Sequence, residues 1–160
     1  MDLTKILSVS GKPGLHKHIA QSKNGVIIES LIDGSRSNAF ASQQVSSLQD
    51  IAIFTYGEDK PLTEVFQDIY KKEDGKQSIS HKSSANELKA FFEEILPDYD
   101  KERVYISNIK RIIEWYNILI ENNLVDLEVP EEEKEEESKT ESSEEDSKQE
   151  PEKEDKDTEK

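Results

Sequence analysis

The spacing of apolar residues divides the chain into a β-rich first part, an α-rich second part and a terminal segment that lacks large apolar residues. In the first part, short apolar runs alternate with turn-forming residues, which is typical of a small antiparallel sheet. Asn24-Gly25 predicts a type I′ hairpin turn, because both central residues of that turn need a positive φ. Three or four short strands are expected at the runs 15–21, 26–31, 36–41 and 51–54, with a turn at 46–50 before the last.

A meander of so few strands needs a second layer, or closure on itself, to bury its apolar side. We expect a small SH3-like β-barrel or an open meander over residues 1–56. Leu3, Ile6 and Leu7 can form one helical turn that plugs an open end.

Three amphipathic helices are predicted over residues 57–129. Pro61 favours a helix start, Ser84 and Glu87 form a capping box before the second helix, and Ser107 is the expected N-cap of the third. Their apolar faces are expected to share one core, with stripes at Leu62, Val65, Phe66, Ile69 and Tyr70; at Leu88, Phe91, Phe92 and Ile95; and at Ile109, Ile112, Ile113, Tyr116, Leu119 and Ile120. The predicted fold class is α+β.

Charge is unevenly distributed along the chain. Of the formal net charge of −15, residues 130–160 supply most, with six Lys against sixteen Asp or Glu, and they contain no Val, Ile, Leu, Phe, Tyr or Trp. Such a segment has nothing to bury against its ordering entropy, so we expect a disordered acidic tail. The predicted division is therefore a small β domain at 1–56, a helical domain at 57–129 and this tail.

The sequence also predicts the environment of the protein. It contains no Cys, which removes disulfides and thiol chemistry, and it has neither an apolar run of membrane-spanning length nor a signal-peptide pattern near the N-terminus. We expect a cytoplasmic protein without a membrane partner.

Several segments together resemble a known family. The sequence resembles, over residues 2–125, a family of uncharacterised Bacteroidota proteins that pair two domains of unknown function. The resemblance implies a two-part division and a Bacteroidota origin, but no activity and no catalytic residue, and His16 stands where an aromatic residue would be expected. It is carried by DLTKILSVSGKPGL at 2–15, KNG at 23–25, VSSL at 45–48, VYISNIK at 104–110 and WYN at 115–117.

Candidate catalytic and metal-binding residues are few. His16 and His18 are two apart on a predicted strand and point to one face, but a metal site needs a third ligand, and only His81 remains. Gly11-Lys12-Pro13-Gly14 lacks the spacing of a phosphate loop and is interpreted as a plain turn. No nucleophile pattern is present. We predict no enzyme activity, no cofactor and no metal.

Two binding functions are left to weigh. The first is a non-enzymatic adaptor or regulatory protein that binds a partner protein, with Trp115 and Tyr105 as candidate contacts. The preferred interpretation of Trp115 itself, however, is that it seals the junction of the two parts. The alternative is an RNA- or ribosome-associated factor that uses Lys17, Lys23 and Arg36. Residues 1–56 carry five Lys or Arg against four Asp or Glu, which is a weak basic footprint, and we predict no DNA binding.

Overall fold

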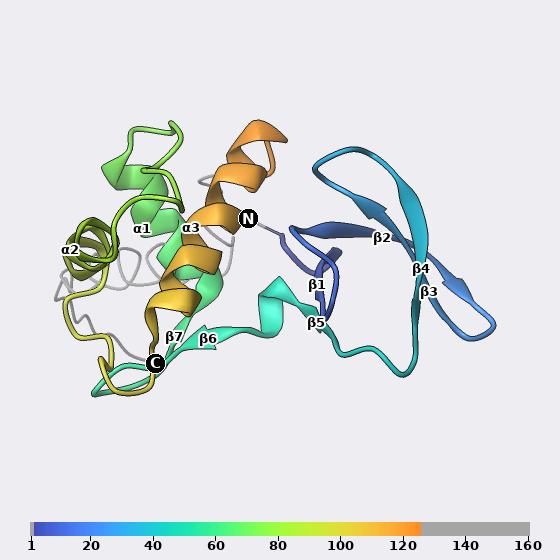
Figure 1. Ribbon diagram of the computed structural model, residues 1–160, viewed down its shortest axis with the longest axis horizontal. Coiled ribbons are helices and arrows are strands. Elements are labelled where there is room, and N and C mark those ends of the chain that lie inside the picture. The colour runs from blue at the N-terminus through green and yellow to red at the C-terminus, as the bar shows by residue number, and fades with distance from the viewer. Residues whose placement is uncertain (1, 126–160) are drawn as a thin grey trace, which may run out of the picture. The chain divides into compact units, whose positions relative to one another are not determined.

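The strands of the first part form one antiparallel sheet, and three helices follow them along the chain (Figure 1). The computed structural model describes residues 2–125. The sheet consists of β1 (Ile6–Val9), β2 (His16–Ser22), β3 (Gly25–Ser30), β4 (Arg36–Phe40) and β5 (Val45–Ser47). The other elements are the 3-10 helix η1 (Leu48–Asp50), the short strands β6 (Ala52–Ile53) and β7 (Lys60–Pro61), and the helices α1 (Leu62–Lys72), α2 (Ala85–Ile95) and α3 (Ile106–Glu121).

The sheet is open. Its strand order is β4-β3-β2-β1-β5, so the first four strands form a meander and β5 returns to pair with β1 at the far side. Within the described residues, β4 and β5 are edge strands, so the sheet does not close and the SH3-like barrel is not confirmed. The structure instead has an open sheet, which agrees with the open meander predicted as the alternative.

An open sheet can leave one face uncovered, yet this one buries a small core of its own. Leu7 and Val9 of β1 pack with Ile28 of β3 and Ala39 of β4, and Val45 of β5 packs against the same group. Because this group draws on both edge strands, the sheet curls around it without closing. Burial of apolar surface is therefore achieved by curvature, where we had expected closure.

Several predictions for the first part are wrong. Leu3, Ile6 and Leu7 do not form a helical turn, because β1 begins at Ile6. Ile6 belongs to the large core that includes the helices, whereas Leu7 belongs to the sheet's own core. Neighbouring residues buried on opposite sides are the signature of a strand. The predicted strand at 51–54 is β6, which pairs with β7 and does not join the sheet, and the predicted turn at 46–50 contains most of β5 and η1.

The β2–β3 hairpin also differs from expectation. Ser22 pairs with Gly25, which makes Lys23 and Asn24 the two central residues of the turn, and neither has a positive φ. The type I′ turn on Asn24-Gly25 is therefore wrong. Gly25 is instead the first residue of β3, where it lies against the backbone of Ala39 and Phe40 in β4.

The three helices are confirmed, and the Ser84–Glu87 capping box is present at the start of α2. The helix α3 begins at Ile106, with Tyr105 as its N-cap, so the expected N-cap at Ser107 is wrong. Within residues 2–125, no helix is long and apolar enough to cross a membrane.

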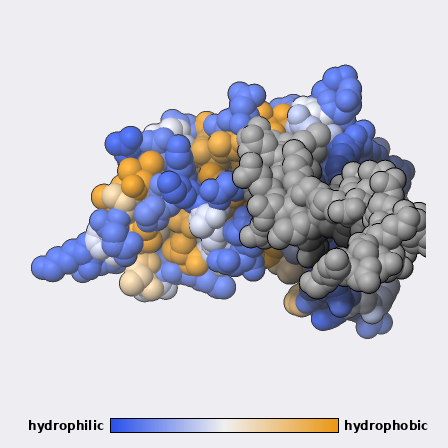
Figure 2. Space-filling model, turned by 180° about the vertical axis from the view of Figure 1, so that it is seen from behind, coloured by the Kyte–Doolittle hydropathy of each residue, from blue (hydrophilic) through white to orange (hydrophobic). Residues whose placement is uncertain are grey.

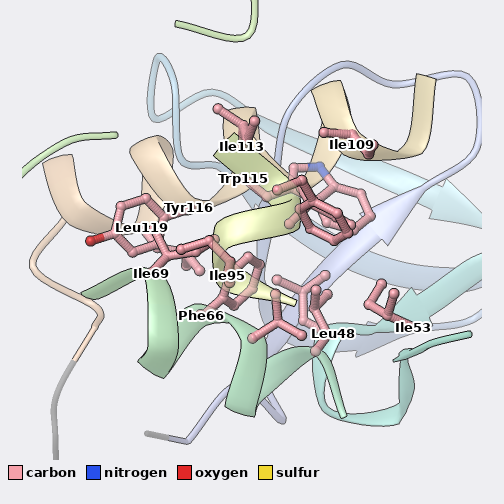
Figure 3. Close-up of a cluster of buried hydrophobic side chains, with 14 of the residues drawn as sticks. Leu48, Ile53, Phe66, Ile69, Ile95, Ile109, Ile113, Trp115, Tyr116 and Leu119 are labelled. Atoms are coloured by element: carbon pink, nitrogen blue, oxygen red, sulfur yellow. The ribbon is translucent and has the colours of Figure 1, made fainter. Parts of the chain in front are cut away.

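The main core joins the helices to the first part of the chain. Leu3, Ile6, Leu15 and Leu48 are buried in one cluster with the apolar faces of α1, α2 and α3. Figure 3 shows part of this cluster, with Leu48 and labelled side chains from each of the three helices. Residues 2–125 all belong to one compact unit. The predicted domain boundary between 56 and 57 stays a prediction, and the predicted acidic tail lies outside the described residues.

The first part also leaves apolar side chains at the surface. Ile19, Ile32 and Phe40 are exposed, with Phe40 at 53%. Figure 2 shows apolar patches of this kind among hydrophilic atoms. Single exposed apolar residues are normal on protein surfaces, and Phe40 serves below as a control position.

Candidate functional site

Two hollows share the side chains of Ile51, Arg111 and Trp115. The larger, here called the polar pocket, has a volume of about 440 Å³ and is lined by Ser8, Val9, Ser10, Gly11, Lys12, Pro13, Gly14, Gln44, Ser46, Ile51, Arg111, Glu114 and Trp115. The smaller, here called the apolar groove, has a volume of about 210 Å³ and is lined by Ile51, Ala52, Ile53, Phe54, Leu62, Val104, Asn108, Arg111, Ile112 and Trp115.

One helix supplies the wall that the two hollows have in common. Arg111, Glu114 and Trp115 are three and four residues apart on α3, which places them on the same side of the helix. Trp115 is 7% exposed and belongs to the main core. The guanidinium carbon of Arg111 lies 6.0 Å from the centre of the Trp115 ring, within the range of a cation–π contact.

The sheet supplies the opposite wall of the polar pocket. Ser8 and Ser46 are direct partners in the pairing of β1 with β5, so their side chains project on the same face. The turn at 11–14 completes the wall. Gly14 has a φ of +72° and lies so close to Ile32 that a Cβ atom would collide with that side chain, and Ile118 of α3 is also within contact distance. Glycine at 14 therefore permits both the positive φ and the close approach of Ile32.

Lys12 is the charged residue of this turn. Its Nζ lies 3.2 Å from Ser37 Oγ, which is a neutral partner. Among the residues that the structure describes, neither Lys12 nor Arg111 forms an ion pair, and Glu114 is the single carboxylate in the lining. The polar pocket thus combines two cations, one carboxylate and several serine hydroxyls.

Aromatic and guanidinium groups border the apolar groove. Phe54 is 43% exposed, and the guanidinium carbon of Arg103 lies 4.3 Å from the centre of its ring. Arg103 is held by Asp100, at 2.7 Å between Nε and Oδ2, and by the carbonyl oxygen of Thr55 at 3.1 Å. The hydrogen bond from Arg103, with the amides of residues 102 and 103, lowers the pKa of Asp100. Asp100 and Thr55 therefore fix the position of the Arg103 guanidinium that lies over the Phe54 ring.

Comparison with known proteins separates the chain at the point where η1 ends. Residues 3–48 match the model of a domain of unknown function (DUF5606), and residues 51–119 match that of a second domain of unknown function (DUF6852). A solution NMR structure of a Northeast Structural Genomics Consortium target from Bacteroides vulgatus is 47% identical. The match covers 78% of this chain and 90% of that chain, with a TM-score of 0.65.

The chain belongs to this two-domain family. The resemblance found in the sequence is thereby confirmed, and so is the order of the two domains. A search of the curated proteins found no match. Ser8 and Lys12 fall in the DUF5606 part, whereas Arg111 and Trp115 fall in the DUF6852 part, so the polar pocket needs both domains of the family.

The structure brings some of the predicted contact residues to this site and leaves others away from it. Trp115 lines both hollows, whereas Tyr105 is 65% exposed and lines neither. Arg111, Glu114 and Lys12 were missed as site residues. The Gly-Lys-Pro-Gly turn was a signal for Lys12, although we interpreted it as a plain turn.

The predicted RNA-contacting residues are not gathered into a positive surface. Lys17 and Arg36 are the direct cross-strand partners of Glu29, one on each side, so a carboxylate separates the two cations. Arg36 Nε forms an ion pair with Glu29 Oε2 at 2.7 Å. Lys23 lies apart from both, in the β2–β3 turn.

The histidines of β2 have a structural setting of their own. His16 is 4% exposed, and its Nδ1 has no hydrogen-bond partner among residues 2–125. Burial, followed by the charge of Lys12, lowers the pKa of His16, while Asp33 acts in the opposite direction. Among residues 2–125, no group of three or more His, Cys, Asp or Glu side chains could hold a metal ion.

Stability is expected to fall on acidification because of His16. The pKa of His16 in the folded protein lies below the ordinary value of 6.5. As the pH falls below 6.5, His16 is therefore protonated in the unfolded chain before it is protonated in the folded protein. The free energy of unfolding should therefore decrease as pH falls through 6.5. Urea unfolding at several pH values should show a shallower decrease in His16→Phe than in the wild type. His81→Gln is the control, since it leaves His16 in place. If the free energy of unfolding depended on pH equally in all three proteins, His16 would not be the cause of the loss of stability.

Proposed function

We propose that the protein is a non-enzymatic adaptor or regulatory protein that binds an apolar segment of a partner protein in the apolar groove. The observation that carries the proposal is an apolar hollow bordered by exposed Phe54, buried Trp115 and two arginines. Aromatic residues and arginine are enriched at protein interfaces and dominate their binding energy.

The size of the groove supports a side chain as its occupant. Sites for drug-sized ligands measure about 300–1,000 Å³, and the groove, at about 210 Å³, is smaller. Its lining is apolar apart from Asn108 and the Arg111 side chain. An anchor residue from another protein, such as Leu, Ile or Phe, suits these dimensions and this surface.

Charge narrows the class of partner further. Arg111 has no ion-pair partner among residues 2–125 and lies at the junction of the two hollows. A partner segment with an acidic residue next to its apolar anchor would satisfy this guanidinium. We therefore expect a segment that combines an apolar anchor with a neighbouring Asp or Glu.

The RNA-binding alternative has less support. RNA affinity depends on cations that neutralise successive phosphates, and Glu29 interrupts the pair Lys17 and Arg36. The cytoplasmic location and the absence of catalysis stay predictions.

A pair of phenylalanine substitutions tests the proposal. Phe54→Ala removes the exposed edge of the groove, and Phe40→Ala removes a comparably exposed ring from β4. Immobilised full-length protein should capture a partner from its own cells as wild type and as Phe40→Ala. Phe54→Ala should bind that partner at least ~10-fold more weakly, since interface aromatic anchors are worth about 2 kcal/mol or more.

The captured partner supplies its own control. A peptide from its binding segment should compete with the whole partner, and replacing the peptide's apolar anchor with alanine should abolish competition. Trp115 is the single tryptophan of the chain, so the same peptide should change its fluorescence. Equal capture by the two phenylalanine variants would overturn the proposal.

A further inference from the structure

We infer that the polar pocket is a second binding site, and that it takes a small molecule carrying a phosphate or carboxylate group. This inference is independent of the partner segment in the apolar groove. The polar pocket has a volume of about 440 Å³, which falls within the range of small-molecule sites. Such sites often lie at the junction of two domains.

The charge of the polar pocket differs from that of the protein as a whole. The protein as a whole carries −15, yet the lining of this pocket contains Lys12 and Arg111 against a single carboxylate, Glu114. Neither cation is neutralised by an ion pair among residues 2–125. A local excess of positive charge in an otherwise acidic protein attracts an anion selectively to this place.

The polar pocket also contains hydrogen-bond donors. The hydroxyls of Ser8 and Ser46 lie side by side on the sheet, and neither makes a side-chain hydrogen bond within the described part of the chain. Serine hydroxyls that line a pocket without such a hydrogen bond are available as donors to a ligand.

The donor groups of the polar pocket indicate the kind of anion that it can bind. A phosphate or carboxylate accepts hydrogen bonds from hydroxyl, ammonium and guanidinium groups, and all three kinds are present. Glu114 would repel a bare anion held against it, but it can accept a hydrogen bond from a hydroxyl or amino group elsewhere on the same molecule. The pocket therefore suits a small organic anion that also carries a donor.

Nuclear magnetic resonance of the full-length, ¹⁵N-labelled protein tests the inference with three probes: inorganic phosphate, acetate and a single-stranded RNA oligonucleotide. Phosphate or acetate should produce saturable shifts, with a dissociation constant of about 1 mM, at Ser8, Lys12, Ser46 and the Trp115 indole. The phosphate and acetate arms distinguish the two anionic groups. Arg111→Gln should weaken the effect ~10-fold, because a hydrogen bond to a charged group is worth about 1.5–3 kcal/mol.

Two control variants isolate the site. Lys17→Gln removes an exposed charge outside the pocket and should leave the titration unchanged. Phe54→Ala should also leave it unchanged, because Phe54 lines only the apolar groove. No saturable shift by about 10 mM of either anion would overturn the inference. So would equal binding by Arg111→Gln and Lys17→Gln, or a response to the RNA alone that centres on Lys17 and Lys23.

Discussion

Replacement of Trp115 by alanine is expected to lower the free energy of unfolding by about 3–5 kcal/mol. The side chain is 7% exposed and packs in the main core, so its removal leaves a cavity that the rigid neighbours fill only in part. A loss of that size is a large fraction of the stability of a typical domain. It should lower the melting temperature by roughly 10 °C or more.

Circular dichroism is the appropriate measurement, because the variant has no tryptophan left to report fluorescence. Tyr105→Ala is the matched control: it removes another aromatic side chain next to α3, but one that is 65% exposed. That change should cost no more than about 0.5 kcal/mol. If the two variants were equally stable, the placement of Trp115 in the core would be contradicted.

A milder change separates the structural role of Trp115 from its part in binding. Trp115→Phe keeps an aromatic ring in the core but removes the indole N–H and narrows the wall shared by the polar pocket and the apolar groove. We expect this variant to fold and to bind both the partner segment and phosphate more weakly. Circular dichroism and the two binding assays described above measure these effects separately.

The helices were predictable because their signals are local. The Ser84–Glu87 capping box and the apolar stripe after it lie within a few turns of one another, and α2 forms where they indicate. The start of α3 was misplaced, because Ser107 is a good N-cap by residue type, whereas Tyr105 occupies the position without a side-chain hydrogen bond.

The sheet was less predictable because its arrangement depends on distant pairings. Leu3, Ile6 and Leu7 have helical spacing and resembled one helical turn, but pairing with β2 and β5 makes residues 6–9 a strand. Nothing local to Val45–Ser47 indicates that this segment pairs with β1 across the sheet. Tertiary pairing overrides such weak local preferences.

The candidate site was predictable only in part for the same reason. Trp115 stood out because it is the single tryptophan and lies on a helix flank. Ser8 and Ser46 become neighbours only through the β1–β5 register. Lys12 and Arg111 line the same pocket only because the turn at 11–14 and α3 come together in the fold. Spacing along the chain carries no information about such contacts between distant segments.

Substitution of Gly25 by alanine is expected to cost about 3 kcal/mol of stability, through a clash in the sheet. A Cβ atom at this position would collide with the carbonyl oxygen of Ala39 and lie 2.9 Å from the Cα of Phe40. Both are backbone atoms of β4, so no side chain can turn away to relieve the contact. The strands must separate there, which adds overpacking strain and weakens the hydrogen bond from the Ala41 amide to the Asn24 carbonyl.

Gly34→Ala distinguishes this clash from the general cost of replacing glycine. Gly34 has a φ of +70°, but a Cβ atom there would meet nothing within 4 Å, so only the conformational penalty of about 1–2 kcal/mol applies. Urea unfolding should therefore rank Gly25→Ala as the less stable variant. Hydrogen exchange at the Ala41 amide should accelerate in Gly25→Ala beyond the acceleration in Gly34→Ala, because only the first change forces β3 and β4 apart. Equal stability and equal exchange in the two variants would show that β3 can accept a side chain at residue 25. The close approach of β3 and β4 would then not require glycine at this position.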